Sequence, residues 1–220
     1  VREKEIGTME QIMVTPIRLA VLISGSGRTL QNFLDLSRTG ALKARVVKVI
    51  SSLSGAYGLV RARQAGVPTA VVRRRDYADC DAFSRAITAE LDKARPDLVA
   101  LAGFMCYYRI PAHYENRVMN IHPALLPSFG GQGFYGERVH EAVLQYGCKV
   151  SGCTVHFVDN VYDAGPVIVQ KTVPVLQDDD VHSLADRVFE KELEAYPEAI
   201  NLFAEGRLRV EGRRVRILPP

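Results

Sequence analysis

Short apolar segments alternate with segments of helical periodicity through the first half of the chain, and this alternation restricts the fold more than any other feature. The apolar segments are rich in β-branched residues, which is typical of strands buried on both faces; they comprise residues 18–24, 46–51, 67–72 and 97–101. Helical patterns begin after Gly27 and cover residues 56–64 and 79–95. Strands joined through helices pair in parallel, so the sequence predicts an α/β fold with a doubly wound, mostly parallel sheet.

The second half of the chain departs from this alternation, and a stretch rich in glycine and proline interrupts it. We expect, in order, a short strand, a short helix, two extended strands, a long amphipathic helix and a terminal β-hairpin, at residues 118–121, 140–146, 152–158, 166–175, 181–203 and 207–218. No linker rich in Pro or Ser separates two halves. We therefore predict one domain over residues 16–220, preceded by an extension at residues 1–15 that lies outside the fold.

Composition and charge exclude several classes of protein. With 47% hydrophobic and 24% charged residues, the chain has the balance of a folded globular protein. Its longest apolar stretch, residues 98–105, is too short to span a bilayer, and a net charge of +3 is too small to favour nucleic acid by electrostatics. The four cysteines form no Cys-x-x-Cys pair, and no metal-ligand spacing occurs. We expect a reduced, cytoplasmic protein without a metal, a membrane partner or a nucleic-acid partner.

A glycine-rich turn, Gly25-Ser26-Gly27-Arg28-Thr29, joins the first expected strand to the first helix. Free backbone N–H groups and the helix dipole at such a position bind anions, and a phosphate is the natural ligand. The turn is neither a dinucleotide fingerprint, which would need glycine where Leu30 stands, nor a P-loop, because the lysine is missing. The alternative is a turn whose glycines serve only close packing.

Asn120 and His122 lie two residues apart at the end of a predicted strand, so their side chains point to the same side of the sheet. An imidazole can carry protons in both directions near neutral pH, and an amide N–H can stabilise an oxyanion. This pair suits the transfer of an acyl-type group. The alternative is a core histidine bonded to a backbone carbonyl, with an asparagine that only supports the turn.

Asp163 lies in a polar loop between two expected strands, from where its carboxylate can orient or charge a histidine. An ordinary turn aspartate is the alternative. Neither serine nor cysteine occurs in a nucleophile elbow of the Gly-x-Ser-x-Gly type, which argues against a covalent acyl-enzyme.

Five ordered segments resemble the phosphoribosylglycinamide formyltransferases: LISGSGRTL at 22–30, LAGFM at 101–105, NIHPALLP at 120–127, GCTVHFV at 152–158 and YDAGPVI at 162–168. The resemblance implies a Rossmann-like sheet and the transfer of a formyl group from 10-formyltetrahydrofolate to the amine of glycinamide ribonucleotide in purine (IMP) biosynthesis. It implies these two small molecules as binding partners, and we expect a monomer or a homodimer.

The resemblance also implies catalytic roles for Asn120, His122 and Asp163, which align with the family's amide, imidazole and carboxylate. The amine would attack the formyl carbon directly, without a metal. Asn120 and protonated His122 would stabilise the tetrahedral intermediate, and Asp163 would keep His122 charged, since a nearby carboxylate raises the pKa of an imidazole. His156 aligns with a histidine close to the catalytic group.

Binding residues follow from the same alignment. Gly27, Arg28 and Thr29 fall where the family binds the phosphate, and Glu192 falls where a glutamate contacts the ribose. Two segments match those that line the folate pocket, comprising Met105, Cys106, Tyr107, Tyr108, Asp159, Asn160, Val161, Tyr162 and Asp163. Core packing is the alternative for Met105, and a solvated position on a helix face is the alternative for Glu192.

The chain departs from the family pattern at several positions. Arg28-Thr29 stands where many members carry Ser-Asn, and Ala124 replaces a frequent serine. Cys80 occupies the place of an arginine that meets the folate, and one of Arg73, Arg74 and Arg75 is a candidate substitute. The loop at residues 128–138 is longer and richer in glycine than in common members, and either a mobile lid or an ordered insertion would fit.

Three related classes share the outline of this pattern: methionyl-tRNA formyltransferases, formyltetrahydrofolate hydrolases and sugar-nucleotide formyltransferases. The first carry an added C-terminal domain and the second an N-terminal regulatory domain, and we expect neither here. A non-catalytic phosphate-binding module would explain the glycine turn but not the coincidence of Asn120, His122 and Asp163.

Overall fold

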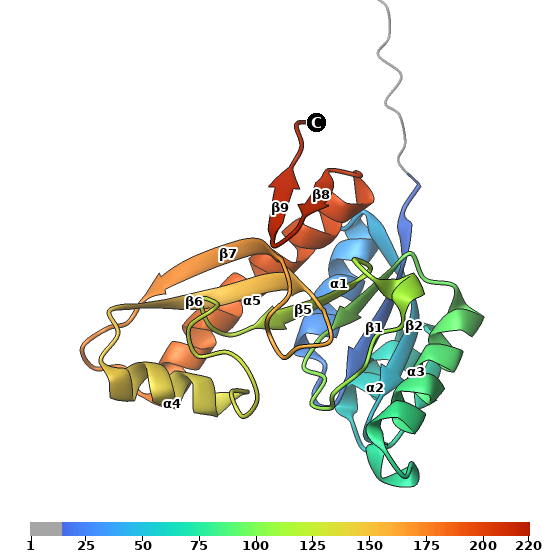
Figure 1. Ribbon diagram of the computed structural model, residues 1–220, viewed down its shortest axis with the longest axis horizontal. Helices are drawn as coiled ribbons and strands as arrows, with labels where there is room; N and C mark the ends of the chain where they lie inside the picture. The colour runs from blue at the N-terminus through green and yellow to red at the C-terminus, as the bar shows by residue number, and fades with distance from the viewer. Residues whose placement is uncertain (1–14) are drawn as a thin grey trace, which may run out of the picture.

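A nine-stranded sheet runs through the protein in the computed structural model, which describes residues 15–220 (Figure 1). Its strands are β1 (Ile17–Ile23), β2 (Ala44–Ser51), β3 (Thr69–Val71), β4 (Leu98–Leu101), β5 (Val118–His122), β6 (Val150–Phe157), β7 (Val167–Pro174), β8 (Leu208–Glu211) and β9 (Arg214–Ile217). The helices are α1 (Arg28–Thr39), α2 (Tyr57–Gln64), α3 (Cys80–Ala94), α4 (Glu137–Tyr146) and α5 (Val181–Ala204), with short 3-10 turns at Arg74–Asp76 and Ala112–Tyr114. Of the predicted extension at residues 1–15, all but Thr15 lies outside the described residues.

The strand order is β3-β2-β1-β4-β5-β6-β7-β9-β8, and the first five strands all run parallel. β6 pairs antiparallel with both β5 and β7, and β8 and β9 form the predicted C-terminal hairpin. The predicted single-domain, doubly wound and mostly parallel architecture is therefore confirmed. In Figure 1, β6, β7 and α4 extend to one side of the sheet, away from β1 to β3.

Alternate residues of β1 show how the sheet divides the core. Leu19, Val21 and Ile23 join one buried cluster with residues of α1, α2 and α5, whereas Ala20 and Leu22 join a second cluster with residues of α3. All five side chains are fully buried, as expected for a central strand of a sheet that helices cover on both faces. In the part of the chain that the structure describes, no helix is long and apolar enough to cross a membrane.

Most boundaries differ from the sequence prediction by one or two residues, and the differences at α4 and β3 have a clear physical cause. α4 begins at Glu137 rather than at residue 140, because Gly136 ends the loop in a positive-φ conformation and Glu137 can enter the first turn, where an acidic side chain is favourable. The predicted loop at residues 128–138 therefore ends at Gly136. β3 is shorter than the predicted 67–72, since Pro68 has no N–H to donate to a ladder.

One buried tyrosine of α5, Tyr196, forms hydrogen bonds with the sheet. The Tyr196 hydroxyl lies 3.1 Å from the carbonyl oxygen of Leu101 and 2.8 Å from that of Met119, so it reaches both β4 and β5. Its ring also packs edge-on against Phe33 of α1, with centroids 5.1 Å apart. These contacts fix the residues one turn earlier on α5 relative to the ends of the central strands.

The sheet order reverses between β1 and β4, and open α/β sheets bind ligands at such a point, beyond the carboxyl ends of the strands. Here the strand ends are joined by hydrogen bonds. The buried Ser24 and Ser52 hydroxyl groups lie 2.6 Å apart, and the Met105 amide donates to the Ser24 oxygen at 2.8 Å. The segments after β1 and β4 are thereby held at a fixed separation.

The turn after β1 approaches the start of α2 closely. Gly27 has a φ of +71°, and a Cβ atom there would lie 2.6 Å from the Gly58 Cα atom. The Gly58 amide donates to the Gly25 carbonyl at 3.1 Å. Close packing is therefore a real requirement at Gly27, in addition to any role in binding an anion.

We predict that Gly27→Ala lowers the free energy of unfolding. The positive φ alone costs about 1–2 kcal/mol for a residue with a Cβ atom, and the overlap with Gly58 adds to this. Gly25→Ala is the matched control, because a Cβ atom there would meet nothing within 4 Å. Urea unfolding followed by circular dichroism measures both variants, and equal midpoints for the two would contradict the packing requirement.

Candidate active site

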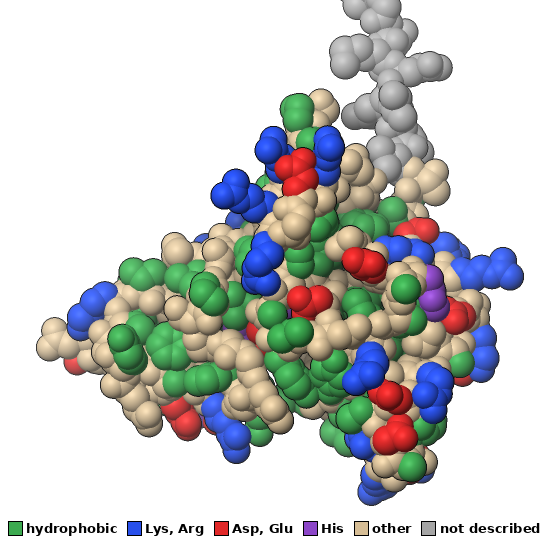
Figure 2. All heavy atoms as spheres, viewed as in Figure 1, with side chains coloured by type: hydrophobic (Ala, Val, Ile, Leu, Met, Phe, Trp, Pro, Cys, Tyr) green, Lys and Arg blue, Asp and Glu red, His purple; other side chains and the backbone are tan. Residues whose placement is uncertain are grey.

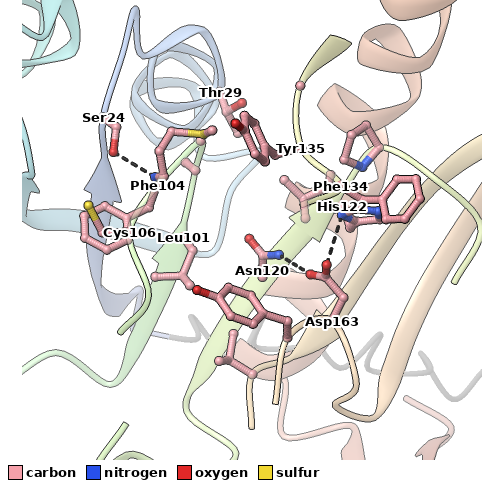
Figure 3. A pocket seen from close by; sticks show the side chains of 18 of the residues that line it. Ser24, Thr29, Leu101, Phe104, Cys106, Asn120, His122, Phe134, Tyr135 and Asp163 are labelled. Carbon is pink, nitrogen blue, oxygen red and sulfur yellow. Dashed lines mark hydrogen bonds and ion pairs between the residues drawn. The ribbon is translucent and has the colours of Figure 1, made fainter. Parts of the chain in front are cut away.

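A cavity of about 740 Å³ opens at the carboxyl ends of β1, β4 and β5 (Figure 3). This volume is typical of sites that bind small molecules. Its wall contains nearly all the residues that the sequence singles out for binding and catalysis, namely Gly27, Arg28, Thr29, Met105, Cys106, Tyr107, Tyr108, Asn120, His122, Asp159, Val161, Tyr162, Asp163 and Glu192. The structure therefore brings together segments that lie more than 150 residues apart in the sequence, from Gly27 to Glu192.

Three side chains meet at the centre of the cavity. Asn120 and His122 project from the same side of β5, and Asp163 reaches them from the loop between β6 and β7 (Figure 3). The His122 Nδ1 atom lies 3.5 Å from Asp163 Oδ2, and the Asn120 Nδ2 atom lies 3.5 Å from Asp163 Oδ1. The carboxylate thus contacts both groups at once.

Asp163 is placed by an unusual backbone conformation and by a backbone donor. Its φ is +51°, and the Gly131 amide donates to Oδ2 at 2.9 Å. Burial raises the pKa of this carboxyl group, but the hydrogen bond from His156, the charge of His122 and the Gly131 amide outweigh burial, so the pKa lies below its ordinary value. The site therefore contains a carboxylate near neutral pH.

Asp163 fixes how the Asn120 amide is turned, because a carboxylate oxygen can only accept and the amide nitrogen must face it. The His156 Nδ1 atom lies 2.8 Å from the carbonyl oxygen of Phe157 and must donate to it, so Nε2 is the ring atom beside Asn120 and Asp163. The Asn120 Nδ2 atom lies 3.3 Å from that Nε2 atom. The amide nitrogen thus faces His156 and Asp163, and Figure 3 shows the amide oxygen turned toward the cavity.

Both nitrogens of the His122 ring face acceptors. Nε2 lies 2.8 Å from the carbonyl oxygen of Phe129, and Nδ1 faces Asp163. Burial lowers the pKa of His122, the carboxylate and the carbonyl raise it, and the net result lies below the ordinary value. Asp163 raises the pKa of His122, as the sequence predicts, but burial acts more strongly in the opposite direction.

One end of the cavity is formed by the start of α1 and by α5. Helix α1 has Gly27 at its N-cap and no side-chain cap, so its first N–H groups point toward the cavity. Burial raises the pKa of Glu192 to about 8, although Arg28 opposes this shift. Glu192 is therefore a half-buried carboxylic acid on the cavity wall and not a solvated charge on a helix face.

The other end is formed by the segments after β4 and β6. Met105 is 55% exposed and lines the cavity, which excludes core packing for it. The Tyr107 and Tyr162 rings lie 5.1 Å apart, and the Tyr107 hydroxyl donates to the Asn160 carbonyl at 2.8 Å. The Asn160 side chain is turned away from the cavity, where it exchanges hydrogen bonds with the backbone of Ile110 and joins the two segments.

The glycine-rich loop at residues 123–136 closes the remaining side. Phe134 and Tyr135 line the cavity, and Figure 3 shows Tyr135 beside Thr29 and Phe134 beside His122. Cys80, which stands in place of a folate-binding arginine, and the candidate substitutes Arg73, Arg74 and Arg75 are not among the residues of the cavity wall. Arg73 instead pairs with Asp76 at 2.7 Å. Ala124 is buried.

Several groups of the site were not predicted from the sequence. The Phe129 carbonyl and the Gly131 amide act through the backbone, so no side-chain type marks them. Phe189 lines the cavity three residues before Glu192. The helical spacing of these two residues predicts a shared face of α5, but it does not say which ligand or element that face meets.

Within residues 15–220, no group of three or more His, Cys, Asp or Glu side chains is placed to hold a metal ion. On the face shown in Figure 2, basic and acidic side chains are interspersed and form no large patch of one sign.

Known formyltransferases match this chain over most of its length. The family model described as formyl transferase matches residues 17–200. The phosphoribosylglycinamide formyltransferase of Escherichia coli is 39% identical over 196 residues, which cover 88% of this chain and 90% of that protein. A crystal structure of glycinamide ribonucleotide transformylase 1 from Symbiobacterium toebii matches with a TM-score of 0.87 and 49% identity, covering 92% of this chain and 94% of that one.

Longer proteins match as well. The trifunctional purine biosynthetic protein adenosine-3 of Drosophila melanogaster is 44% identical over 193 residues, which cover 86% of this chain. The chain spans only 14% of the length of that relative.

We predict that His122 makes stability depend on pH. Because burial lowers its pKa in the folded state, the unfolded chain takes up a proton at higher pH, and stability falls as the pH drops below about 6.5. One group contributes at most about 1.4 kcal/mol per pH unit. Urea unfolding at pH 7.5 and 5.5 should show a smaller loss for His122→Gln than for wild type. Equal losses would contradict the lowered pKa.

Proposed function

The chain belongs to the formyl transferase family, and we propose that it transfers the formyl group of 10-formyltetrahydrofolate to the amine of glycinamide ribonucleotide, a step of purine biosynthesis. The observation that carries this proposal is the meeting of Asn120, His122 and Asp163 inside a cavity that also contains an uncapped helix N-terminus. The names of the relatives that match nearly their full length support the choice of substrates.

The two ends of the cavity suit the two substrates. The phosphate of the ribonucleotide would lie against Gly27, Arg28 and Thr29, with Glu192 at the ribose. The folate would lie along the other end, against residues Met105, Cys106, Tyr107, Tyr108, Asp159, Val161 and Tyr162. Asn160 would act there by holding the two folate segments together rather than by touching the ligand. The amine and the formyl carbon would then meet at Asn120 and His122.

We propose direct transfer without a covalent intermediate on the enzyme. The amine attacks the formyl carbon, a new C–N bond forms, and the carbonyl oxygen becomes an oxyanion. His122 turns its Nε2–H, which faces the Phe129 carbonyl in this structure, to this oxygen, and Asp163 at Nδ1 stabilises the imidazolium as charge develops. The bond between the formyl carbon and the folate nitrogen then breaks, and the proton lost by the amine reaches that nitrogen through His122 or water.

Asn120 would act on the other half of the tetrahedral intermediate. The sequence predicts that its N–H stabilises the oxyanion, but in this structure the amide nitrogen faces His156 and Asp163. The amide oxygen is the atom directed into the cavity (Figure 3). It can accept a hydrogen bond from the attacking amine, which becomes cationic in the intermediate, and so stabilise the intermediate from that side.

The proposal is tested by the absorbance change as 10-formyl-5,8-dideazafolate loses its formyl group, with glycinamide ribonucleotide present and then omitted. We expect turnover only with the ribonucleotide. His122→Ala should lower kcat by about 10²–10⁴-fold, as is typical of a lost acid–base group. Turnover without the ribonucleotide would indicate a hydrolase, and unchanged kcat in His122→Ala would contradict the role of this side chain.

We further predict that Glu192 binds the ribonucleotide in its neutral form. Its pKa of about 8 leaves the carboxyl group mostly protonated at pH 7, so Glu192→Gln should keep the KM for the ribonucleotide near the wild-type value. Glu192→Ala loses the hydrogen bond and should raise this KM roughly 10-fold. Above pH 8 the wild-type group ionises beside the phosphate, so its KM should rise while that of Glu192→Gln does not. A parallel rise in both proteins would contradict this assignment.

A further inference from the structure

One face of α5 meets the start of α1 at the phosphate end of the cavity. Asp186, Phe189 and Glu192 are spaced three residues apart, so they follow one another along the same side of the helix. Phe189 and Glu192 line the cavity, and so does Arg28, the first residue of α1. The contacts of Arg28 with this face are therefore part of the cavity wall.

The Arg28 side chain is held mainly by an aromatic ring. Its guanidinium carbon lies 3.8 Å from the centroid of the Phe189 ring. The guanidinium also lies 3.9 Å from Oδ1 of Asp186, and both of these side chains are more than half exposed. An exposed arginine has many rotamers, so the ring restricts where this charge lies.

Contact through the ring face leaves the arginine free to bind an anion. A guanidinium group carries its N–H donors in its plane, and a contact made through its face does not use them. These donors can bind a phosphate through two parallel hydrogen bonds. A carboxylate partner in good geometry would consume the same donors, but Asp186 lies at the outer limit of an ion pair.

We propose that Phe189 is a positioning residue for the substrate phosphate: its ring holds Arg28 beside the open N-terminus of α1, with the guanidinium donors left for the phosphate. This inference rests on the proposed function, in which the phosphate of the ribonucleotide binds at this turn. Asp186 is the competing anion, and a phosphate dianion at the helix N-terminus displaces it because the phosphate carries more charge and meets the helix N–H groups as well.

The test is a double-mutant cycle on the full chain, with Phe189→Leu, Arg28→Gln and the double variant. A cation–π contact at an exposed site corresponds to about a 2–5-fold change in affinity. Phe189→Leu should therefore raise the KM for glycinamide ribonucleotide about 2–5-fold, with kcat and the KM for the folate unchanged. Phe189→Tyr keeps an aromatic face and should behave as wild type, and Asp186→Asn should lower the KM.

The cycle separates positioning from simple packing. In the Arg28→Gln background, Phe189→Leu should have no further effect, because the ring has no cation left to hold. Phe203→Leu, the same change on α5 away from the cavity wall, is the control for loss of helix stability. An equal KM increase from Phe189→Leu with and without Arg28 would overturn the proposal, since the ring would then pack against the sugar.

Calorimetric titration of the same four proteins with ribose 5-phosphate keeps this inference separate from the proposed reaction. If the wild-type protein binds ribose 5-phosphate but shows no formyl transfer, the proposed function fails. The dissociation constants of the four proteins still test whether Phe189 and Arg28 act together. Weaker binding caused by Phe189→Leu only when Arg28 is present supports the positioning role. Binding that does not respond to Phe189→Leu in either background overturns it.

Discussion

The Ser24 hydroxyl joins the ends of three neighbouring parallel strands, and the geometry of the whole cavity depends on this junction. It lies 2.6 Å from the Ser52 hydroxyl after β2 and accepts from the Met105 amide after β4 at 2.8 Å. Parallel strands end with backbone groups that the ladder no longer satisfies, and burying them without partners is costly. The Ser24 hydroxyl satisfies one such group, the Met105 amide, and thereby links the turn after β1 to the segment that begins at Met105.

One backbone conformation at Gly27 can serve both close packing and the proposed binding of an anion. Gly27 must lie against Gly58 for α1 and α2 to pack, and its positive φ turns the first N–H groups of α1 into the cavity. Close packing is therefore compatible with the proposed anion binding at this turn. The backbone conformation that permits the close approach is the one that leaves the helix N-terminus open.

Burial and local charge act in opposite directions on His122. Burial favours the neutral ring, whereas Asp163 and the Phe129 carbonyl favour the charged one, and burial prevails. A neutral imidazole whose surroundings already contain two acceptors is prepared for charge that arises only during the reaction. Asp163 is itself kept ionised by His156 and by the Gly131 amide, so the carboxylate remains available to stabilise that charge.

Local sequence patterns predict some parts of the site, and they miss the parts that depend on long-range contacts or on backbone groups. Alternation within one strand places Asn120 and His122 on the same side, and the strand–helix order places the glycine turn at the sheet switch point; both are local patterns.

Asp163 comes within 3.5 Å of His122 only through the pairing of β5 with β6. This is a long-range contact, which the family resemblance indicates and periodicity does not. The direction of the His122 pKa depends on burial, which local periodicity does not give, and the 123–136 loop meets His122 and Asp163 through a carbonyl at Phe129 and an amide at Gly131. Gly131, with a φ of +95°, adopts a conformation that few other residues would tolerate, so a glycine at this position allows the backbone amide to reach Asp163.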